Sequence, residues 1–565
     1  MQSRVRHIIF YRMDGLPPMF KITHLSRPIW SSFTYNLVFA AFITLIQNIA
    51  YYRQVLHLVA IDSWQNGLFL ATMPAVIFAV LNILFTLLFI SWLRQGVVAL
   101  LLLGGAAVQY FMINYGIIID RTMMQNVFET NMAESMALVT PQYLLWLTLL
   151  GLVPALGALW VKIKPTPLSW IALGARCFSI LMSIVAILLV ATFFYKDYAS
   201  LMRNNKELVK SLTPSNIIFA NISYYRHHAQ ANLPLVQIGL DAHKKPLPGG
   251  DAKKNLVILV VGETSRAENF SLGGYDKPTN PRLTNDNVVY FSQTASCGTS
   301  TGVSVPCMFS NMPRAGYDEQ LASHQEGLLD VLQHAGVNVS WQENDGGCKG
   351  ACDRVPTQDI TELKLPGQCI DGECHDEALF NGVEDYINQL NNDGIIVLHT
   401  MGSHGPAYYQ RYPDAFRKFT PTCDTNQIQT CSRESLINTY DNTILYIDYI
   451  VDKAINVLKG HQDKFNTALV YLSDHGESLG EDGIYLHSMP YAVAPTQQTH
   501  IPMLMWLSGG YQQQFSINDS CMRKQAGQQR FSQDNLFHTV LGMFNIATKE
   551  YQPPLDILQP CRGTS

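Results

Sequence analysis

The sequence predicts an α/β protein with two unlike parts, a five-helix transmembrane domain followed by an α/β domain outside the cytoplasm. Charged residues make up only 15% of the 565 residues, well below the usual share in soluble domains. Residues 1–195 hold 11 Lys and Arg against 5 Asp and Glu, whereas the rest of the chain has a net charge of −11. Ten of the eleven cysteines lie after residue 195, where apolar runs alternate with helical patterns. We therefore expect the two parts to occupy different solvents.

Five uncharged stretches predict the transmembrane helices, because a helix of about 20 apolar residues spans a bilayer. They are residues 33–52, 66–93, 96–119, 141–161 and roughly 177–194. Buried helices of a soluble protein are the alternative, but such helices rarely repeat five times without a charge. A cleaved signal peptide is disfavoured because the apolar stretches begin late, are long and recur.

Basic residues near the ends of these stretches predict their orientation in the membrane. On the cytoplasmic side we place Arg4, Arg6, Arg12, Lys21, Arg27, Arg94, Lys162, Lys164 and Arg176. The alternate loops carry only Arg53 and Arg121. A cytoplasmic N-terminus and an odd number of crossings put residues 196–565 outside the cytoplasm.

Cysteine usage agrees with an oxidising compartment for the second part. Cys177 lies in the last apolar stretch, and the other ten cysteines form an even set. Close neighbours in sequence are Cys297/Cys307, Cys348/Cys352, Cys369/Cys374 and Cys423/Cys431, which leaves Cys521 and Cys561. We expect disulfides, with local pairing as a hypothesis because sequence alone does not prove connectivity. Cysteine-based zinc sites are the alternative, but the spacings are irregular.

The chain is expected to divide into three segments: 1–195 in the membrane, 196–250 as connector and linker, and 251–565 as the α/β domain. The connector mixes aromatic, basic and apolar residues, typical of a membrane-surface helix or of an ordinary solvated linker. The turn-rich "KKPLPGG", residues 244–250, marks its end. Beyond it, β-rich runs at 255–263, 337–344, 394–402, 468–476 and 502–508 alternate with helical segments. This alternation indicates a largely parallel sheet.

Three of these runs end in polar residues, at the edge where parallel strands place their carboxyl ends. Glu263 ends the first run, His399 and His404 lie at the end of the third, and Asp474 and His475 lie at the end of the fourth. Carboxylates with an imidazole suit a divalent metal of the zinc type, which offsets the cost of burying their charge. Taken singly, each residue is more often a solvated loop residue. Their joint placement after apolar strands favours the metal site.

A hydroxyl-rich loop, "SCGTSTGVSVPCMFS" at residues 296–310, supplies candidate nucleophiles beside such a metal. A metal lowers the pKa of a bound hydroxyl and makes an alkoxide accessible near neutral pH. Composition does not distinguish among Thr299, Ser300, Thr301 and Ser304. A purely structural loop closed by Cys297 and Cys307 is the alternative.

Four segments together closely resemble the lipid A phosphoethanolamine transferases, membrane members of the alkaline phosphatase/sulfatase superfamily that include polymyxin-resistance enzymes. They are "VVGETSRAENFSLGGY", "SCGTSTGVSVPCMF", "GSHGPAYYQRYP" and "YLSDHGESLGEDGIYLH". The resemblance covers nearly the whole chain and implies an α/β domain of the alkaline phosphatase/sulfatase type. It implies that Thr301 is the nucleophile that becomes modified with phosphoethanolamine. It also implies that Glu263, Thr301, Asp474 and His475 hold one Zn²⁺ tightly, with room for a second, weaker site.

The resemblance extends to substrate-binding residues and to the cysteines. His404 and His487 match positions that line the substrate phosphate or a second metal, and Lys349 matches a phosphate contact. Asn126, Thr130 and Glu134 match residues around the phosphoethanolamine group. The five cysteine pairs, including Cys521/Cys561, look like the family's disulfides. Gly302 and Ser488 depart from the commoner Ala and Gly of the family, and Asp345 is Asn in some relatives.

The expected function is a two-step transfer at the outer face of the bacterial inner membrane, in the periplasm. The donor would be phosphatidylethanolamine and the acceptor a phosphate of lipid A, so polymyxin or colistin resistance is the implied phenotype. We expect a monomer and no nucleic-acid partner. A sulfatase is disfavoured because no Arg lies between Cys297 and Cys307. A transferase of phosphoglycerol, or one with a sugar or protein acceptor, stays open, and a non-catalytic envelope scaffold would be expected to lack some of the ligands.

Overall fold

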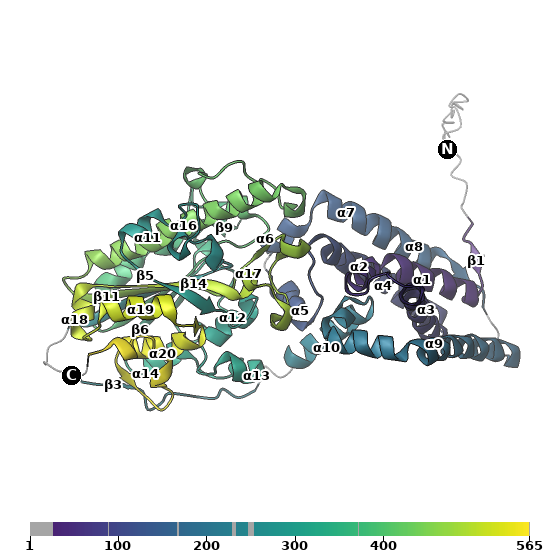
Figure 1. The fold of residues 1–565 in the computed structure, drawn as a ribbon, viewed down its shortest axis with the longest axis horizontal. Coiled ribbons are helices and arrows are strands. Elements are labelled where there is room, and N and C mark those ends of the chain that lie inside the picture. Colours follow the sequence, from purple (N-terminus) through teal and green to yellow (C-terminus); the bar gives the residue numbers. More distant parts are fainter. Residues whose placement is uncertain are drawn as a thin grey trace, which may run out of the picture.

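The computed structural model describes residues 26–88, 90–130, 132–165, 169–228, 233–246, 253–370 and 372–563. Residues 1–25, which include the basic residues Arg4, Arg6, Arg12 and Lys21, and most of the predicted linker 244–250 lie outside these ranges. A bundle of helices and an α/β domain lie end to end, joined by short helices (Figure 1). The predicted fold class is thus confirmed.

Long apolar helices build the N-terminal part. They are α1 (Ser32–Ile46), α2 (Ile49–Leu58), α3 (Trp64–Leu87), α4 (Ser91–Asn114), α7 to α8 with an intervening π-helical turn (Pro141–Trp160) and α9 (Trp170–Asn204). Within the described ranges, four of these helices are long and apolar enough to cross a membrane, and five if the bent pair α1–α2 is one span. The number and places of the predicted spans therefore agree with the structure when that pair is counted as one.

The bend between α1 and α2 was not predicted from the sequence, and two buried amides explain it. The helices meet at 49° across Gln47 and Asn48, which lie inside the predicted span 33–52. Gln47 Nε2 donates to the carbonyl of Leu102 at 2.7 Å. Asn48 Nδ2 donates to the carbonyl of Thr213 at 2.9 Å. Tertiary hydrogen bonds of this kind compensate for the helix bonds that the break removes.

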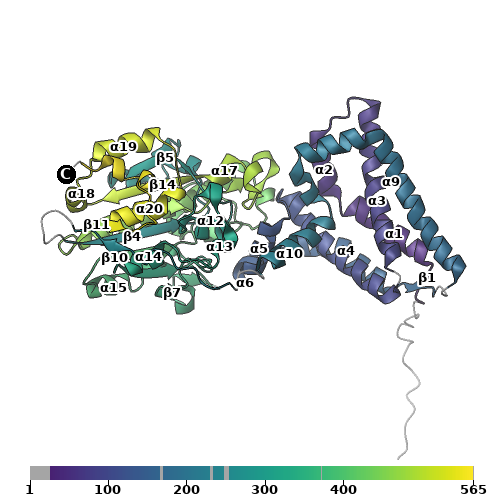
Figure 2. The ribbon, with the colours of Figure 1, turned by 90° about the horizontal axis from the view of Figure 1, so that it is seen from below.

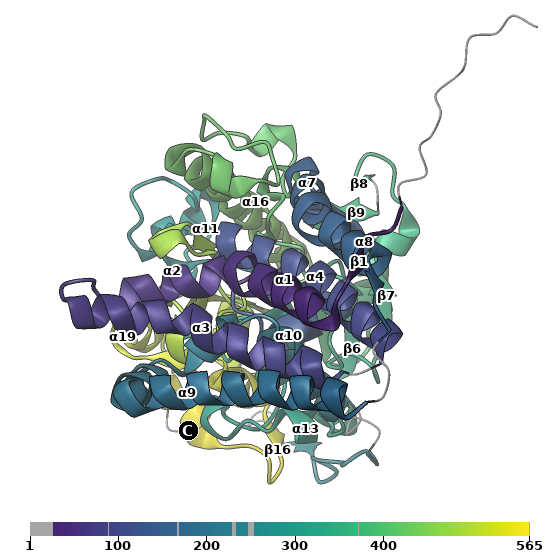
Figure 3. The same ribbon diagram turned by 90° about the vertical axis from the view of Figure 1, so that its right-hand side faces the viewer.

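Helix starts in this part are set by hydroxyl caps. Ser31, Ser63 and Ser169 accept hydrogen bonds from backbone N–H groups in the first turns of α1, α3 and α9. Such caps satisfy donors that the helix itself leaves unpaired. Helix α9 lies along one edge of the bundle, next to α3 (Figure 3), and little of its surface is buried in the protein. This exposure is expected of a helix whose surroundings are lipid.

Short elements join the bundle to the α/β domain (Figure 2). They are α5 (Arg121–Glu129), α6 (Met132–Leu138), the 3₁₀ helix Lys206–Ser211 and α10 (Ser215–His228). Helix α9 runs through the predicted boundary at residue 195 as far as Asn204. Direct contacts hold the two parts together: the N–H of Tyr485 donates to the carbonyl of Tyr115 at 2.9 Å, and Arg121 pairs with Glu319 at 2.6 Å.

Eight strands of the described chain form the central sheet of the α/β domain, in the order β15-β5-β14-β11-β4-β10-β6-β7. Their bounds are Phe531–Ser532, Val289–Ala295, His500–Leu507, Phe465–Ser473, Lys254–Gly262, Gly394–His399, Asn338–Glu343 and Thr357–Asp359, in that order. Strand β14 is antiparallel to both β11 and β5, and the other neighbours are parallel. The sheet is therefore largely parallel, as predicted, but mixed at the predicted run 502–508.

Helices cover both faces of this sheet, so its strands are apolar on both sides. In β4, Leu256, Ile258 and Val260 pack towards α16, whereas Val257, Leu259 and Val261 pack towards the opposite layer. The covering helices are α11 (Pro281–Asn285), α12 (Thr301–Met308), α13 (Glu319–Ala322), α14 (Leu328–His334), α15 (Val383–Gln389), α16 (Arg433–Gly460), α17 (Thr496–Thr499), α18 (Gly509–Gln514), α19 (Asp519–Gln528) and α20 (Asp534–Met543).

Two-stranded pairs complete the structure: β1 (Ile29–Trp30) with β2 (Lys162–Ile163), β3 (His243–Lys244) with β16 (Ile546–Ala547), β8 (Cys369–Ile370) with β9 (Glu373–Cys374), and β12 (Ser478–Leu479) with β13 (Tyr485–Leu486). All five expected disulfides are present: Cys297–Cys307, Cys348–Cys352, Cys369–Cys374, Cys423–Cys431 and Cys521–Cys561. Cys177 in α9 is the one free cysteine among the described residues.

Candidate active site

The ends of two neighbouring parallel strands bring three of the predicted metal ligands together. Glu263 follows β4, and Asp474 and His475 follow β11, where Ser473 lies in register with Gly262. His475 Nε2 lies 3.5 Å from Glu263 Oε1 and 3.3 Å from Asp474 Oδ2. One atom from each of the three side chains lies within 4.8 Å of the other two.

The fourth predicted ligand, Thr301, reaches the same cluster from the first position of α12. Its hydroxyl donates to Glu263 Oε2 at 3.1 Å. The Thr301 side chain thus lies at a helix N-terminus, where backbone N–H groups and the helix dipole favour an anion such as a phosphoryl group. Thr299 and Ser304 serve the loop itself, because Thr299 donates to the carbonyl of Met489 at 2.6 Å and Ser304 accepts from the N–H of Gly298. Among these candidates, the geometry favours Thr301.

The chemistry of the three-residue cluster fits a divalent metal ion. Glu263, Asp474 and His475 are all 0% exposed, and Glu263 Oε1, Asp474 Oδ2 and His475 Nε2 have no hydrogen-bond partner. Burial, and then the neighbouring carboxylates of Asp474 and Asp345, raise the pKa of Glu263 well above its usual range. A bound cation would balance these carboxylates. Two carboxylates and an imidazole, with a hydroxyl beside them, are donors suited to zinc.

His475 is oriented for metal binding by its own backbone. Its Nδ1 lies 2.8 Å from the carbonyl oxygen of Gly476, which only accepts, so Nδ1 carries the proton and Nε2 faces the carboxylates. Burial lowers the pKa of the imidazole to about 4, which keeps the ring neutral at physiological pH. A neutral ring with a free Nε2 is the form that a metal requires.

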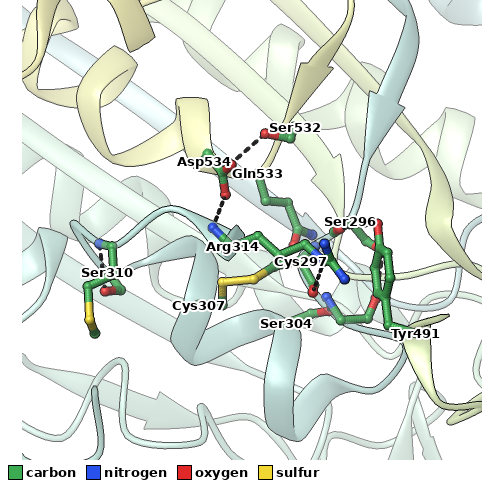
Figure 4. The surroundings of a disulfide bond; sticks show 12 residues. Ser296, Cys297, Ser304, Cys307, Ser310, Arg314, Tyr491, Ser532, Gln533 and Asp534 are labelled. Atoms are coloured by element: carbon green, nitrogen blue, oxygen red, sulfur yellow. Dashed lines mark hydrogen bonds between the residues drawn. A yellow bond between two sulfur atoms is a disulfide. The ribbon is translucent and has the colours of Figure 1, made fainter. Parts of the chain in front are cut away.

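The disulfide Cys297–Cys307 closes the loop that carries Thr301 (Figure 4). Arg314 Nε donates to the carbonyl of Cys297 at 3.1 Å, and its guanidinium stacks on the ring of Tyr491. The N–H of Arg314 donates to Asp534 at 2.8 Å. These contacts fix the loop from outside the cluster, so the position of the hydroxyl does not depend on the ligands alone.

The buried side chain of Gln533 also contacts the site, and no pattern in the sequence had indicated it. Its Oε1 accepts from the N–H of Cys297 at 2.7 Å. Its Nε2 donates to the carbonyls of Ser473 at 2.8 Å and Asp474 at 2.6 Å. One buried side chain therefore ties the nucleophile loop to the strand end that carries two ligands.

Two further imidazoles extend from the cluster. The ring of His487 lies 4.6 Å from that of His475 and 5.5 Å from that of His404, measured between centroids. His487 Nδ1 lies 3.3 Å from Oε1 of the buried Glu477. Burial, and then the neighbouring imidazole of His487, lower the pKa of His404 well below its usual range. The structure thus brings both predicted histidines to the site, and His404 is uncharged at neutral pH.

Helix α5 carries residues of the N-terminal part into the site. Asn126 Nδ2 donates to Ser488 Oγ at 2.5 Å, and the N–H of Ser488 donates to the carbonyl of Thr299 at 2.7 Å. Thr130 donates to the carbonyl of Asn126. Asn126 is therefore linked through Ser488 to the nucleophile loop, and Thr130 follows one turn later at the end of α5. Glu134 lies in α6, and its side chain is outside the described part of the structure.

A cavity of about 670 Å³ opens beside the nucleophile. Its wall combines residues of both parts of the molecule: Gln125, Glu129 and Tyr224 from α5 and α10, Gly302 and Pro306 from α12, and Glu343, Gly346 and Lys349 from the loop after β6. Lys349 lies close enough to Asp345 and His404 for its charge to affect the pKa of both. Lys349, the predicted phosphate contact, thus lines the cavity.

Asp345 and His399 were not among the predicted site residues, although His399 was expected at this edge of the sheet. His399 ends β10 in register with Val261 of β4, and Asp345 follows β6. One atom from each lies within 4.8 Å of a Glu263 oxygen. Asp345 and His399 lie at the ends of β6 and β10, whose register pairs His399 with Glu343. Pairing the two corresponding runs as parallel neighbours would have indicated both residues.

Comparisons with known proteins agree with this architecture. Residues 255–546 match the family described as Sulfatase, which defines the class of the α/β domain. Residues 77–229 match the family described as phosphoethanolamine transferase EptA/EptB. The chain is 60% identical to phosphoethanolamine transferase EptA of Escherichia coli K12, over 96% of this chain and 99% of that one. It is 36% identical to phosphatidylethanolamine transferase Mcr-1 of Escherichia coli, over 83% and 88%.

The structural comparison leads to the same group. The integral membrane lipooligosaccharide phosphoethanolamine transferase A of Neisseria meningitidis has a TM-score of 0.91 at 42% identity, covering 95% of this chain and 100% of that one. The chain belongs to the EptA family of phosphoethanolamine transferases. It is an inner-membrane enzyme whose catalytic domain lies in the periplasm.

Proposed function

We propose that this enzyme transfers phosphoethanolamine from phosphatidylethanolamine to a phosphate of lipid A through a phospho-threonine intermediate at Thr301. The observation that carries the proposal is the hydrogen bond from Thr301 to Glu263 within a buried ligand cluster, at a helix N-terminus beside a cavity. The relatives named for phosphatidylethanolamine transfer and for lipooligosaccharide modification support the choice of substrates.

In the first step, Thr301 Oγ1 attacks the phosphorus of the donor diester. A bond forms between Oγ1 and phosphorus, and the bond from phosphorus to the glycerol oxygen breaks. Before the attack, the hydroxyl proton of Thr301 is donated to Glu263 in a hydrogen bond. As the threonine loses this proton, one proton is delivered to the glycerol oxygen, so that diacylglycerol leaves as a neutral alcohol. The product is a threonine phosphodiester that carries ethanolamine.

In the second step, a phosphate oxygen of lipid A attacks the same phosphorus. The bond from phosphorus to Thr301 Oγ1 breaks, and the threonine recovers a proton. We assign His404 and His487 as proton carriers or as groups that orient the phosphates, since the ring of His487 lies 4.6 Å from that of His475 and 5.5 Å from that of His404. Lys349 provides a positive charge at the cavity wall for the phosphates of both substrates.

A Zn²⁺ ion held by Glu263, Asp474, His475 and Thr301 would lower the pKa of the threonine hydroxyl and balance charge on the phosphoryl oxygens. The protein's own contribution is to hold these four groups together and to exclude water from them. Asn126, Thr130 and Glu134 on α5 and α6 are assigned to the phosphoethanolamine group, because these helices join the cavity to the membrane part.

The location of the cavity suits substrates that are themselves membrane lipids. We assign residues 1–195 to the transmembrane domain, 196–250 to the connector and 251–565 to the catalytic domain, acting as a monomer. Adding a cationic amine to lipid A reduces the anionic surface that basic peptides bind, so colistin resistance is the expected phenotype.

Mass spectrometry tests this function directly. Lipid A from cells that express the enzyme should gain the mass of one phosphoethanolamine group relative to cells with the Thr301→Val variant. The intact Glu263→Gln variant, mixed with phosphatidylethanolamine, should not acquire the group on Thr301, whereas the wild-type protein should do so transiently. Unmodified lipid A in the presence of active, membrane-inserted protein would reject the acceptor, and modified lipid A with Thr301→Val would reject the nucleophile.

A further inference from the structure

A second group of potential metal ligands shares Glu263 with the first. Glu263, Asp345 and His399 each offer one atom, and these atoms lie within 4.8 Å of one another. All three side chains are buried, with 0% of His399 and 5% of the Asp345 side chain exposed. The group contains two carboxylates and one imidazole, the same donors as Glu263, Asp474 and His475.

His399 is held in the orientation that a metal ligand needs. Its Nδ1 lies 2.8 Å from Oε2 of Glu343, whose own position is fixed by two donors. Trp341 Nε1 donates to Glu343 Oε2 at 2.8 Å, and the N–H of Asp345 donates to Glu343 Oε1 at 2.6 Å. A carboxylate that binds one ring nitrogen and turns the other towards a cation is the usual support of a metal-binding histidine.

The other ring nitrogen of His399 points into the group without a hydrogen-bond partner. His399 Nε2 is buried and unbonded, and the 3.7 Å to Asp345 Oδ2 is too long for a hydrogen bond. A buried polar atom without a partner is costly unless something else binds it. The spacing between Nε2 and the carboxylates instead leaves room for an ion that all three would contact.

Charge in this region points the same way. Burial raises the pKa of Asp345 well above its usual range, and the neighbouring Glu343 and Asp474 add to that effect, whereas the charges of His399 and Lys349 oppose it. A cation held by Glu263, Asp474 and His475 would balance Glu263 and Asp474, but Asp345 and His399 form a separate group with Glu263. A second cation would balance Asp345 directly and leave Glu263 shared between the two ions.

We propose that Glu263, Asp345 and His399 bind a second divalent cation, with Glu263 as a ligand common to both ions. This site differs in place from the second metal position that the family resemblance implied at His404 and His487. Its donors suit Mn²⁺, Mg²⁺ or Zn²⁺. Glu343 and Gly346, which flank Asp345, line the 670 Å³ cavity, so the ion reaches the site from there. The inference concerns metal binding and goes beyond the proposed transfer reaction.

Metal stoichiometry and electron paramagnetic resonance of the full-length enzyme in detergent test the proposal, with Mn²⁺ as the probe. Chelator-treated wild-type protein should bind two Mn²⁺ per chain. The two ions should give an exchange-broadened signal, because they share the carboxylate of Glu263. The variants Asp345→Asn and His399→Gln should each bind one Mn²⁺ and show the sharp, hyperfine-split signal of an isolated ion. The remaining ion in each variant reports that the first site, and with it the fold, is intact.

Two matched variants locate the second ion. His404→Gln removes an imidazole from the alternative position and should keep two coupled ions. Glu343→Gln leaves the ligands in place but weakens the support of His399, and should raise the Kd of the second ion about 10-fold to 100-fold. Thr301→Val, which lacks the proposed nucleophile, should still bind the second ion, so loss of transfer and loss of the site are separately visible.

The wild-type measurement alone is sufficient to overturn the proposal. One Mn²⁺ per chain at saturation would mean that His399 is an imidazolium that balances Glu343 and Asp345 without a metal. Two ions that remain in Asp345→Asn and drop to one in His404→Gln would place the second ion at the histidine pair instead.

Discussion

The hydroxyl of Thr301 donates to Glu263 across 3.1 Å, although the two residues lie 38 positions apart and on different layers of the domain. Glu263 is fixed by the end of β4, and Thr301 by the first turn of α12 and the disulfide that closes its loop. The hydroxyl is thus held against a carboxylate before any substrate arrives. This preorganisation is what a threonine, weakly acidic in water, requires to act as a nucleophile.

The first prediction concerns the hydroxyl itself. Thr301→Val keeps the shape of the side chain and removes the hydroxyl, so the rate of phosphoethanolamine transfer should fall at least about 1000-fold. The melting temperature should change little, because the variant loses one hydrogen bond, from the Thr301 hydroxyl to Glu263. Initial rates on a fluorescent phosphatidylethanolamine check the first, and thermal unfolding in detergent checks the second.

Thr299→Val is the matched control, two residues earlier in the same loop. Its hydroxyl donates to the carbonyl of Met489, so this variant should lose about 1 kcal/mol of stability and retain chemistry within about 10-fold. Equal loss of activity in the two variants would mean that the loop, and not the Thr301 hydroxyl, determines the rate.

The second prediction concerns Gln533. Gln533→Leu leaves the N–H of Cys297 and the carbonyls of Ser473 and Asp474 without their buried partner. We expect a loss of about 2 to 5 kcal/mol in unfolding free energy, together with a lower kcat, because the loop and the ligand strand are no longer tied. Urea unfolding and steady-state kinetics measure the two effects.

Gln333→Leu is the control, because it makes the same substitution at an exposed position of α14. It should match the wild-type protein in both assays. A Gln533→Leu protein with normal kcat and reduced stability would show that Gln533 supports the fold without positioning the site.

The third prediction separates stability from activity by comparing two disulfides. Cys521–Cys561 spans 40 residues and Cys297–Cys307 spans 10. Because a longer loop gains more chain entropy when the crosslink is lost, replacing the first pair by alanine should cost about 4 kcal/mol and the second about 3 kcal/mol. Activity should show the reverse order, since Cys297–Cys307 holds the loop of Thr301. Calorimetry and transfer rates on both double variants give the comparison.

The order of activity losses is the informative outcome. If the variant without Cys521–Cys561 loses more activity at a temperature where both variants are folded, then the nucleophile loop does not need its disulfide. In that case the contacts of Arg314 with Cys297, Asp534 and Tyr491 are sufficient to hold it.

Three of the four predicted ligands, Glu263, Asp474 and His475, share one readable property: each lies at the end of an apolar run that forms a central strand. Glu263 ends one such run and Asp474 and His475 end another, so a parallel arrangement brings them together. Gln533 has no such signal, because it follows the two-residue strand β15 at the far edge of the sheet. Its role depends on tertiary placement, which local pattern does not contain.

The direction of a strand in the sheet also could not be predicted from the sequence pattern. The run 502–508 was predicted as one strand of a largely parallel sheet, and the structure places β14 antiparallel between β5 and β11. An apolar run buried on both faces has the same composition in either direction. Strand β5 was not predicted at all, since its sequence "VYFSQTA" mixes polar residues among the apolar ones.

The fourth prediction concerns Ser488, which combines a left-handed backbone with a hydrogen bond from Asn126. Ser488 has φ of +71°, and its hydroxyl accepts from Asn126 at 2.5 Å. Ser488→Gly removes both the strain and the hydrogen bond, whereas Ser488→Ala removes the hydrogen bond alone. The glycine variant should therefore be more stable than the alanine variant by about 1 kcal/mol, with the same reduced kcat/KM.

Asn126→Ala completes a double-mutant cycle with Ser488→Ala. If the hydrogen bond positions α5 for the donor lipid, the double variant should lose no more kcat/KM than either single variant. Additive losses would mean that Asn126 and Ser488 act separately on the substrate.

The fifth prediction concerns pH and a histidine remote from the site. His538 is 1% exposed in α20, and burial lowers its pKa to about 4 from the ordinary 6.5. Its Nδ1 accepts from the N–H of Gln552 at 3.2 Å, which requires the neutral ring. The unfolded chain takes up the proton near pH 6.5, whereas the folded chain resists it until about pH 4. The stability contributed by the neutral ring is therefore complete above pH 6.5 and is lost as the pH falls towards 4.

By pH 5 this loss amounts to about 2 kcal/mol. His538→Asn keeps an acceptor in the place of Nδ1 without a titratable ring, so its unfolding free energy should change less between pH 7 and pH 5 by about that amount. His243→Asn, at an exposed position, should follow the wild-type curve. Urea unfolding at pH 7 and pH 5 measures this difference. An equal change in unfolding free energy for the wild type and for His538→Asn would mean that His538 takes up its proton without destabilising the folded domain.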